Sequence, residues 1–300
     1  MNKTQTRWLV LTAAALLCAT AAQAASRSVD MRKPADLEGQ VEIDAVAGSV
    51  SVAGWDRPEI EVTGTIGDRV ERVDLSTTND HATVRVVLPA ASVWGGDTSA
   101  DLVVHIPRKS VLTSSVVSAD LTTHDLSGEQ RLRTVSGKID AMVARDAHLS
   151  TISGNLHVVA QPGAGSVELE SISGAITMEG PVEEIRSQTV SGNTILKLTS
   201  IKNARLKTIS GDVRFSGSLP AGGRIEAGSV SGDLRIGFNA TQGADYDIDT
   251  HTGTIVNCFG PAPQTPTYGP GSQLVFRDGD GSGRVHLHSM SGNIELCNHL

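Results

Sequence analysis

Short segments in which apolar and polar residues alternate make up most of this chain. Apolar side chains lie two and four places after a recurring glycine, as in Leu156 and Val158. Alternation with a period of two is typical of β-strands, because successive side chains point to opposite faces. A second apolar set precedes the glycine by two, five and seven places, as in Ile172, Leu169 and Val167. The pattern predicts two short strands in each unit, with both apolar sets inside and a turn at the glycine.

These strand pairs repeat with a period of roughly 20 residues. The glycines that mark the units are Gly137, Gly154, Gly174, Gly192, Gly211, Gly232, Gly253 and Gly292. Self-similarity at such a period indicates a solenoid, in which each unit buries its apolar face against its neighbours. We therefore predict an all-β fold, a parallel β-solenoid (single-stranded β-helix) of about ten coils, each pairing with the next at roughly 4.8 Å. Right-handed coils are expected, because crossovers between parallel strands are almost always right-handed.

A serine precedes the glycine in most units. The column comprises Ser118, Ser136, Ser153, Ser173, Ser191, Ser210, Ser231 and Ser291, with Thr252 in one unit. A catalytic serine is needed once, with a base beside it, whereas a serine or threonine recurs here in every unit and no histidine recurs with it. We interpret the Ser-Gly motif as architecture, at a turn where a positive φ or a close backbone approach excludes a Cβ atom.

The beginning of the chain has the features of a secretory signal peptide. Lys3 and Arg7 precede an apolar run from Trp8 to Ala19, and Ala22-Gln23-Ala24 offers small residues for cleavage. We predict a signal peptide over residues 1–24, cleaved near Ala24, and a periplasmic or secreted protein. No later segment approaches the ~18 apolar residues of a transmembrane helix, so no membrane span is expected.

The remainder divides into three parts. Residues 25–38 are expected to be a linker. Residues 39–110 fit the repeat once and then alternate as strands between polar turns, which predicts a first coil plus a β meander that covers its open edge. Residues 111–300 carry the solenoid repeats, interrupted by a Pro-rich excursion at 259–283.

Three segments carry a resemblance to a known family. They are Gly48-Ser49-Val50-Ser51-Val52-Ala53-Gly54-Trp55-Asp56, Ala100-Asp101-Leu102-Val103-Val104-His105-Ile106-Pro107, and the serial Val-Ser-Gly-x-Ile units that follow. From about residue 36 to residue 300 the chain resembles the bacterial putative-adhesin β-strand repeat family of the DUF4097 type, a domain of unknown function. The resemblance implies an exported β-helix-like protein labelled as an adhesin, and it transfers no catalytic residues.

Cys258 and Cys297 are the cysteines that remain after the predicted signal peptide. Each lies five places after its motif glycine, so stacking of the two units in equal phase would place their Cα atoms one strand spacing apart. A disulfide requires Cα atoms roughly 4.4–6.8 Å apart, and an oxidising compartment would let it form. The alternative is a pair of unpaired buried thiols.

The Pro-rich excursion is the longest interruption of the repeat. It contains the aromatic residues Phe259, Tyr268 and Phe276 and four closely spaced prolines. Proline stiffens a loop that has no strand partner and so reduces the entropy lost on binding. The three rings could form a contact surface, or they could cap the end of the core.

Aspartates and histidines near the C-terminus are candidate metal ligands. Equal phase sets Asp247 beside His286 and Asp249 beside His288, a set that could hold zinc. Alternate strand positions lie about 7 Å apart, however, so a solvated ladder of charge pairs fits better. The stretch 278–283 resembles half a calcium loop, but a serine stands where the bidentate glutamate belongs, and a Gly/Asp turn explains it equally. We predict no metal and no cofactor.

Composition narrows the functional classes. The formal net charge is -8, which disfavours nucleic acids as partners, and only 3% of residues are aromatic. We predict an exported non-enzymatic envelope protein, an adhesin or scaffold whose outer face binds another protein or a surface polymer. A β-helix enzyme acting on polysaccharides through paired carboxylates and a purely structural periplasmic protein are the alternatives.

Overall fold

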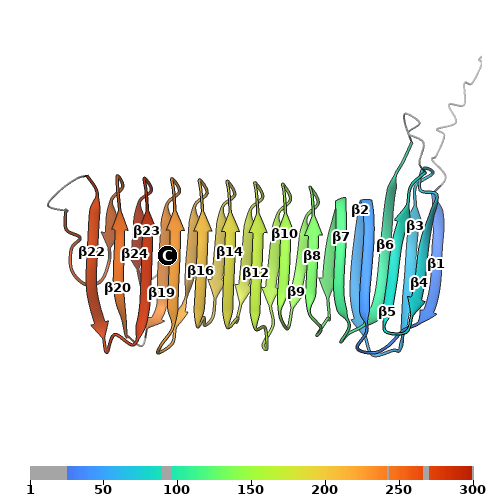
Figure 1. The fold of residues 1–300 in the computed structure, drawn as a ribbon, viewed down its shortest axis with the longest axis horizontal. Coiled ribbons are helices and arrows are strands. Elements are labelled where there is room, and N and C mark those ends of the chain that lie inside the picture. Colours follow the sequence, from blue (N-terminus) through green and yellow to red (C-terminus); the bar gives the residue numbers. More distant parts are fainter. Residues whose placement is uncertain (1–25, 90–95, 242, 266–269, 299–300) are drawn as a thin grey trace, which may run out of the picture.

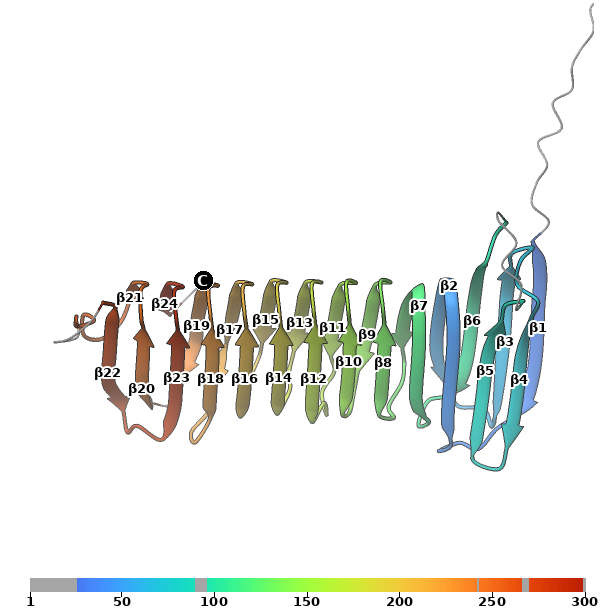
Figure 2. The same ribbon diagram turned by 45° about the horizontal axis from the view of Figure 1, so that its top comes forward.

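The computed structural model describes residues 26–89, 96–241, 243–265 and 270–298. In these ranges the chain forms 24 β-strands and no helix, and therefore no helix long and apolar enough to cross a membrane. The strands pair into one large, mostly parallel sheet that nearly closes on itself as a flattened solenoid (Figures 1 and 2). The expected all-β solenoid is confirmed, while the number of coils and their right-handed sense remain predictions.

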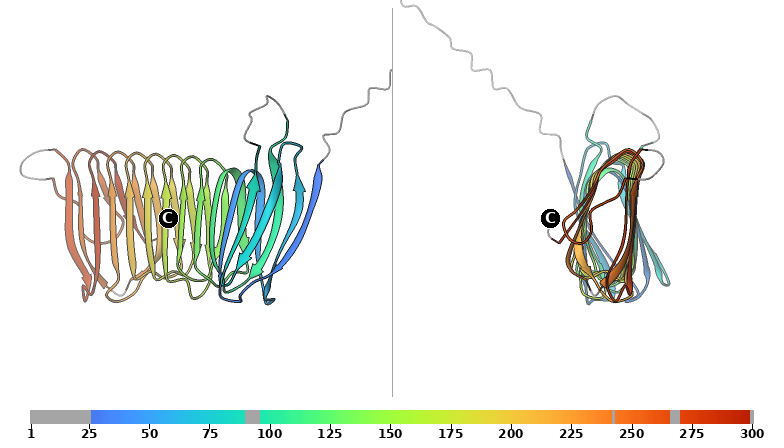
Figure 3. Two further views of the ribbon diagram at one scale, coloured as in Figure 1. Left: turned by 45° about the vertical axis from the view of Figure 1, so that its right-hand side comes forward. Right: turned by 90° about the vertical axis from the view of Figure 1, so that its left-hand side faces the viewer.

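Each repeat unit contributes one strand to each of two broad faces, as the view along the solenoid shows (Figure 3). The strands before the motif glycine form face 1: β8 (Gln130–Thr134), β10 (Ala147–Thr151), β12 (Ser166–Ser171), β14 (Glu184–Thr189), β16 (Asn203–Thr208) and β18 (Arg224–Ser229). The strands after it form face 2: β9 (Ile139–Val143), β11 (Leu156–Ala160), β13 (Ile176–Gly180), β15 (Thr194–Leu198), β17 (Val213–Leu219) and β19 (Leu234–Thr241). Neighbouring strands pair in parallel, so equivalent positions form columns.

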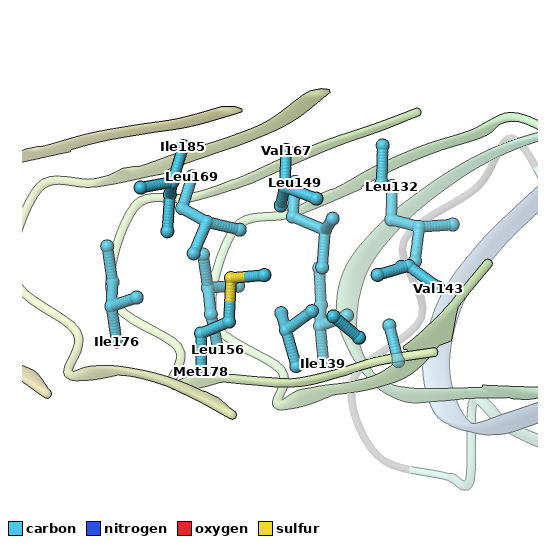
Figure 4. Packing of buried hydrophobic residues seen from close by; sticks show 14 of the residues in the cluster. Leu132, Ile139, Val143, Leu149, Leu156, Val167, Leu169, Ile176, Met178 and Ile185 are labelled. Atoms are coloured by element: carbon cyan, nitrogen blue, oxygen red, sulfur yellow. The ribbon is translucent and has the colours of Figure 1, made fainter. Parts of the chain in front are cut away.

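The interior is a stack of aliphatic side chains from both faces. Leu149 of β10 lies in register with Leu132 of β8 and Leu169 of β12, and all three are fully buried. Side chains of face 2, such as Leu156 and Ile176, pack in the same core (Figure 4). A single unit would expose this surface, so the core exists only because the units stack.

One apolar position expected in the core lies outside it. Ile172, two places before Gly174, is 51% exposed, and its equivalents in the other units are exposed as well. The position three places before the glycine faces inward instead, where Ser171 is 4% exposed. The alternation of β12 thus continues to the turn without a break. The polar residue can occupy the inward position because its hydroxyl is hydrogen-bonded there.

The N-terminal strands extend the solenoid beyond its first repeat units. They are β2 (Gln40–Trp55), β3 (Glu59–Ile66), β4 (Arg72–Thr78), β5 (His81–Val87), β6 (Ser99–Pro107) and β7 (Val111–His124). β2 and β7 pair in parallel over most of their length, and β7 then leads into β8 and β9. β5 and β6 pair with β2 on its other side, and the antiparallel strands β4 and β3 lie outside them.

The segment 25–38, expected to be a linker, contains a strand. β1 (Arg27–Pro34) pairs antiparallel with β3 along its whole length. Val29 and Met31 of this strand pack against the core. Charged residues such as Asp30 and Arg32 alternate with them, so the sequence contains too few apolar residues here to predict a strand.

The C-terminal strands depart from sequence order. They are β20 (Gly243–Thr250), β21 (Ile255–Asn257), β22 (Ser272–Gly279), β23 (Gly283–Ser289) and β24 (Ile294–Cys297). β18 and β19 pair with β23 and β24, and β20 and β21 lie on the far side of those two strands. The last unit is therefore inserted between the two units that precede it (Figure 2), contrary to the expectation that each unit pairs with the next. β22 pairs antiparallel with β20 and covers the end of face 1.

Candidate functional site

The recurring Thr-x-Ser-Gly turn is held by its two hydroxyl residues. The buried Oγ1 of Thr208 accepts the N–H of Gly211 at 3.0 Å. The Oγ of Ser210 donates to the carbonyl oxygen of Val190 in the neighbouring unit at 3.2 Å. Equivalent bonds link six further serines of the column to their neighbouring units: Ser136, Ser153, Ser173, Ser191, Ser231 and Ser291. These contacts give the serine column a structural role.

Loss of the buried hydroxyl should cost more than loss of the exposed one. Thr208→Val is expected to lower the unfolding free energy by about 1–3 kcal/mol, because the buried N–H of Gly211 loses its acceptor. Ser210→Ala removes a solvent-exposed hydrogen bond and should cost less than about 1 kcal/mol. Urea denaturation of both variants measures the difference, and equal losses would contradict this division of roles.

A continuous row of exposed apolar side chains runs along the turn side of face 1. We call it the apolar row; it consists of the residues that precede the column serines: Val117, Val135, Ile152, Ile172, Val190, Ile209, Val230 and Met290. Each of them is 41–51% exposed, and together they are eight of the 13 large hydrophobic residues exposed in the described chain. Exposed apolar residues concentrated in this way mark interaction surfaces, whereas scattered ones do not.

A groove of about 740 Å³ lies beside the apolar row. Its other wall is formed by the residues four places before six of the motif glycines, which we call the outer column: Ser150, Glu170, Gln188, Lys207, Gly228 and His288. Buried hydroxyl residues such as Thr189 form its floor. A volume of this size suits recognition of a ligand or of part of a partner, so the apolar row and its groove are the candidate functional site.

The next column of face 1, six places before each glycine, consists of charged residues that pair within the chain. Glu168 lies 3.1 Å from His148 and 3.7 Å from Arg186. Arg205 and Glu226 lie 3.2 Å apart. We call this set the charged column. Its pairs are partly or fully open to solvent, so each contributes little to stability, but they define the charge pattern beside the groove.

The aspartates and histidines near the C-terminus pair as their equal phase predicts. The Oδ2 atom of Asp247 lies 3.5 Å from Nδ1 of His286, and that of Asp249 lies 2.7 Å from Nδ1 of His288. Among the residues that the structure describes, no three His, Cys, Asp or Glu side chains gather as a metal-binding group. In the stretch 278–283, a carboxylate oxygen of Asp280 accepts the N–H of Ser282 at 3.0 Å, as in a tight turn.

We expect neither zinc nor EDTA to change the melting temperature of the protein. Each of the two pairs is complete in itself, and a metal that binds only the native state would raise the melting temperature. Differential scanning calorimetry with and without zinc tests this expectation. A rise with zinc that the double variant His286→Gln/His288→Gln abolishes would show a metal site instead.

Comparison with known proteins identifies the family. The family described as Toastrack DUF4097 matches residues 69–297. The chain belongs to this family. The Toastrack fold is also seen in a solved structure described as a putative adhesin from Parabacteroides distasonis, with a TM-score of 0.50 and 13% identity over 90% of this chain and 97% of that chain.

Two further solved structures are more distant from this Toastrack chain. A putative adhesin from Bacteroides fragilis has a TM-score of 0.44 and 8% identity, over 90% of this chain and 97% of that chain. A putative lipid binding protein from Parabacteroides distasonis has a TM-score of 0.48 and 11% identity, over 89% of this chain and 96% of that chain. No curated protein matches the sequence.

The two cysteines of the Toastrack repeats meet. Cys258, after β21, and Cys297, at the end of β24, form a disulfide with Cα atoms 4.8 Å apart. They belong to adjacent units because β24 is inserted next to β21. The bond therefore joins the inserted unit to the unit that lies outside it.

Aromatic side chains close the core at the same end of the Toastrack solenoid. Phe276 stacks on Tyr246 with ring centroids 4.5 Å apart, and Phe259 packs edge-on to Tyr246 at 5.8 Å. These contacts favour the cap interpretation for Phe259 and Phe276, whereas Tyr268 lies outside the described residues. Nearby, hydrogen bonds from Arg277 hold the pKa of Asp245 below its ordinary value.

Proposed function

We propose that this Toastrack protein is an exported, non-enzymatic envelope protein, an adhesin or scaffold that acts by binding other molecules through the apolar row. The observation that carries the proposal is the row itself, eight side chains each 41–51% exposed in one line. Contact between apolar surface and water costs about 25 cal/mol per Å². Binding of a partner over the row would remove this apolar surface from water and stabilise the complex by that free energy.

Two further features support export and a role in contact with other molecules. The disulfide between Cys258 and Cys297 suits an oxidising compartment, and residues 1–24 have the pattern of a signal peptide. The name of the Parabacteroides neighbour, a putative adhesin, agrees with a binding role.

The hydroxyl contacts of the repeats support binding over catalysis. A serine nucleophile needs a neighbouring base that takes its proton. The column serines instead donate to main-chain carbonyl oxygens, as Ser191 does to Ile172 at 3.3 Å. The most frequent candidate nucleophile of the chain is thus engaged in holding units together.

Co-sedimentation tests the proposal. The oxidised protein without residues 1–24 is mixed with isolated peptidoglycan, outer-membrane vesicles or intact cells, and the bound fraction is measured against concentration. The test variant is Ile172→Lys/Ile209→Lys, which places two charges in the middle of the apolar row. The matched control is Met142→Lys on face 2, where the methionine is 44% exposed but lies outside the row.

We expect saturable binding of the wild type and of Met142→Lys to one of the fractions, and at least about tenfold weaker binding of the double variant, since burial of a lysine charge against an apolar partner is costly. Circular dichroism confirms that each variant is folded. The proposal is overturned if the wild type neither binds a fraction nor self-associates through the row, or if the double variant binds as well as the control.

A further inference from the structure

We propose that the partner of the apolar row is a second copy of this chain, in an antiparallel dimer whose two-fold axis runs along β14. This inference rests on the proposed function, because it takes the apolar row as a binding surface and names what covers it. In the dimer, face 1 of one copy lies on face 1 of the other, and the two solenoids run in opposite directions.

The first argument comes from the outer column. Its residues follow one another in register on consecutive strands, in the order Ser150, Glu170, Gln188, Lys207, Gly228. Glu170 and Lys207 are thus separated by one strand on either side of β14, about 10 Å apart by strand spacing. In the described part of the chain neither side chain has an ion-pair partner, unlike the charged column beside them.

A two-fold axis along β14 pairs these two charges. It exchanges β12 with β16, so Glu170 of each copy meets Lys207 of the other, and the interface gains two symmetric ion pairs. The same rotation brings Ser150 against Gly228, two small residues. An axis along β12 or β16 would instead place Glu170 or Lys207 against its own copy. An isologous interface must be self-complementary in this way.

The part of the charged column on the four strands nearest the axis obeys the same symmetry. The axis brings Glu168 opposite Arg205, a pair of opposite charge, and His148 opposite Glu226, where an imidazole N–H faces a carboxylate. Arg186 lies on the axis and meets its own copy. Each Arg186 guanidinium lies within 4 Å of Glu168 and Glu184 of its own chain, at 3.7 and 3.8 Å, which offsets the repulsion.

The apolar row gives the interface its hydrophobic part. Val190 lies on the axis and meets its own copy, Ile172 meets Ile209, and Ile152 meets Val230. Every one of these residues is between 42% and 51% exposed in the isolated chain. The three columns on β14 and the three strands on either side of it present about 21 positions, within the roughly 20–30 residues per side of a stable protein interface.

Charge exchange provides the test. Sedimentation velocity measures the dimer dissociation constant of the oxidised protein without residues 1–24, for the wild type, Glu170→Lys, Lys207→Glu and the double exchange Glu170→Lys/Lys207→Glu. We expect a wild-type dimer, about tenfold or greater weakening by each single variant because two like-charge contacts replace two ion pairs, and recovery in the double exchange. A monomeric wild type, or a double exchange as weak as the single variants, would overturn the dimer.

A cysteine on the axis provides an independent readout. Val190→Cys should form an intermolecular disulfide on mild oxidation, because the two thiols meet across the axis. The matched control is Val117→Cys at the end of the row, which the rotation places opposite His251 of the other copy. Equal crosslinking of the two variants would contradict the axis along β14.

The two proposals fail in different ways. The charge-exchange variants leave the apolar row intact. A monomeric wild type that still binds an envelope fraction through the row would overturn the dimer alone and show that another protein, a polymer or a lipid covers the row. Absence of both dimer and binding would overturn the proposed function as well.

Discussion

Gly174→Ala is expected to lower the unfolding free energy by about 3–5 kcal/mol, at the upper end of what single substitutions do. A Cβ atom at this position would lie 1.6 Å from the carbonyl oxygen of Gly154 in the neighbouring unit. The obstacle is main chain, held on both sides by strand pairing, so the strain cannot be relieved by a side-chain rotation. Urea denaturation measures the loss. To make room for the Cβ atom the two units would have to move apart, and even a small displacement would weaken the hydrogen bonds between them.

Gly228→Ala is the matched control for this prediction. Gly228 lies on β18 of the same face, and a Cβ atom there would have no heavy atom within 4 Å. We expect its unfolding free energy to be unchanged or higher by up to about 1 kcal/mol, because alanine costs less conformational entropy than glycine in a strand. Similar losses for the two variants would show that close packing of the motif glycines is not what excludes a side chain.

The structure also identifies why the motif requires glycine. The sequence allows either a positive φ or a close approach, and none of the motif glycines from Gly137 to Gly292 has a positive φ. Built Cβ atoms at Gly154, Gly192 and Gly211 meet the carbonyl oxygen of the preceding glycine at 1.9, 1.9 and 2.0 Å. Close approach is therefore the reason, and it follows from stacking, which a single unit of sequence does not display.

The period of the repeat was sufficient to predict the solenoid, but hydrophobicity alone misplaced one column. Ile172 and its equivalents are apolar, so the sequence favours the core for them, yet strand parity places them with Glu170 on the outside. Parity also puts Ser171 inside, where Gly174 donates to its hydroxyl oxygen. The candidate site was thus visible in the sequence as a column but was assigned to the wrong face. Counting alternate positions along the strand from the buried Leu169 would have placed Ser171 inside and Ile172 outside, and would thus have identified the exposed apolar row.

The order of the C-terminal units could not be predicted from the sequence. Every unit presents a similar parallel edge, so the pairing of β18 with β23 and its pairing with β20 satisfy the same hydrogen-bond pattern. The long interval between Gly253 and Gly292 indicates an excursion but not the position to which the chain returns. Cys258 and Cys297 occupy the same position relative to the motif glycine in their units. Their disulfide is therefore compatible with sequential stacking and with insertion of the last unit, because the two units are neighbours in both arrangements.

Removal of the disulfide is the second substitution that should strongly lower the unfolding free energy. Cys258→Ala/Cys297→Ala is expected to lower the unfolding free energy by about 4 kcal/mol, the loop-closure entropy for the 39-residue separation of the two cysteines. The loss should be concentrated at one end. β23 and β24 are held between neighbours on both sides, and without the bond they can leave only if β20 and β21 separate from them.

Hydrogen exchange locates this effect. In the double variant, amides of β20, β21, β23 and β24 should lose protection while those of β10 to β14 keep it, because contacts between repeat units are local. Reduction of the wild type should reproduce the pattern, and the reductant should leave the double variant unchanged. Uniform loss of protection along the solenoid would show that the inserted unit is not a separate cooperative element and that the disulfide stabilises the whole stack through the unfolded state.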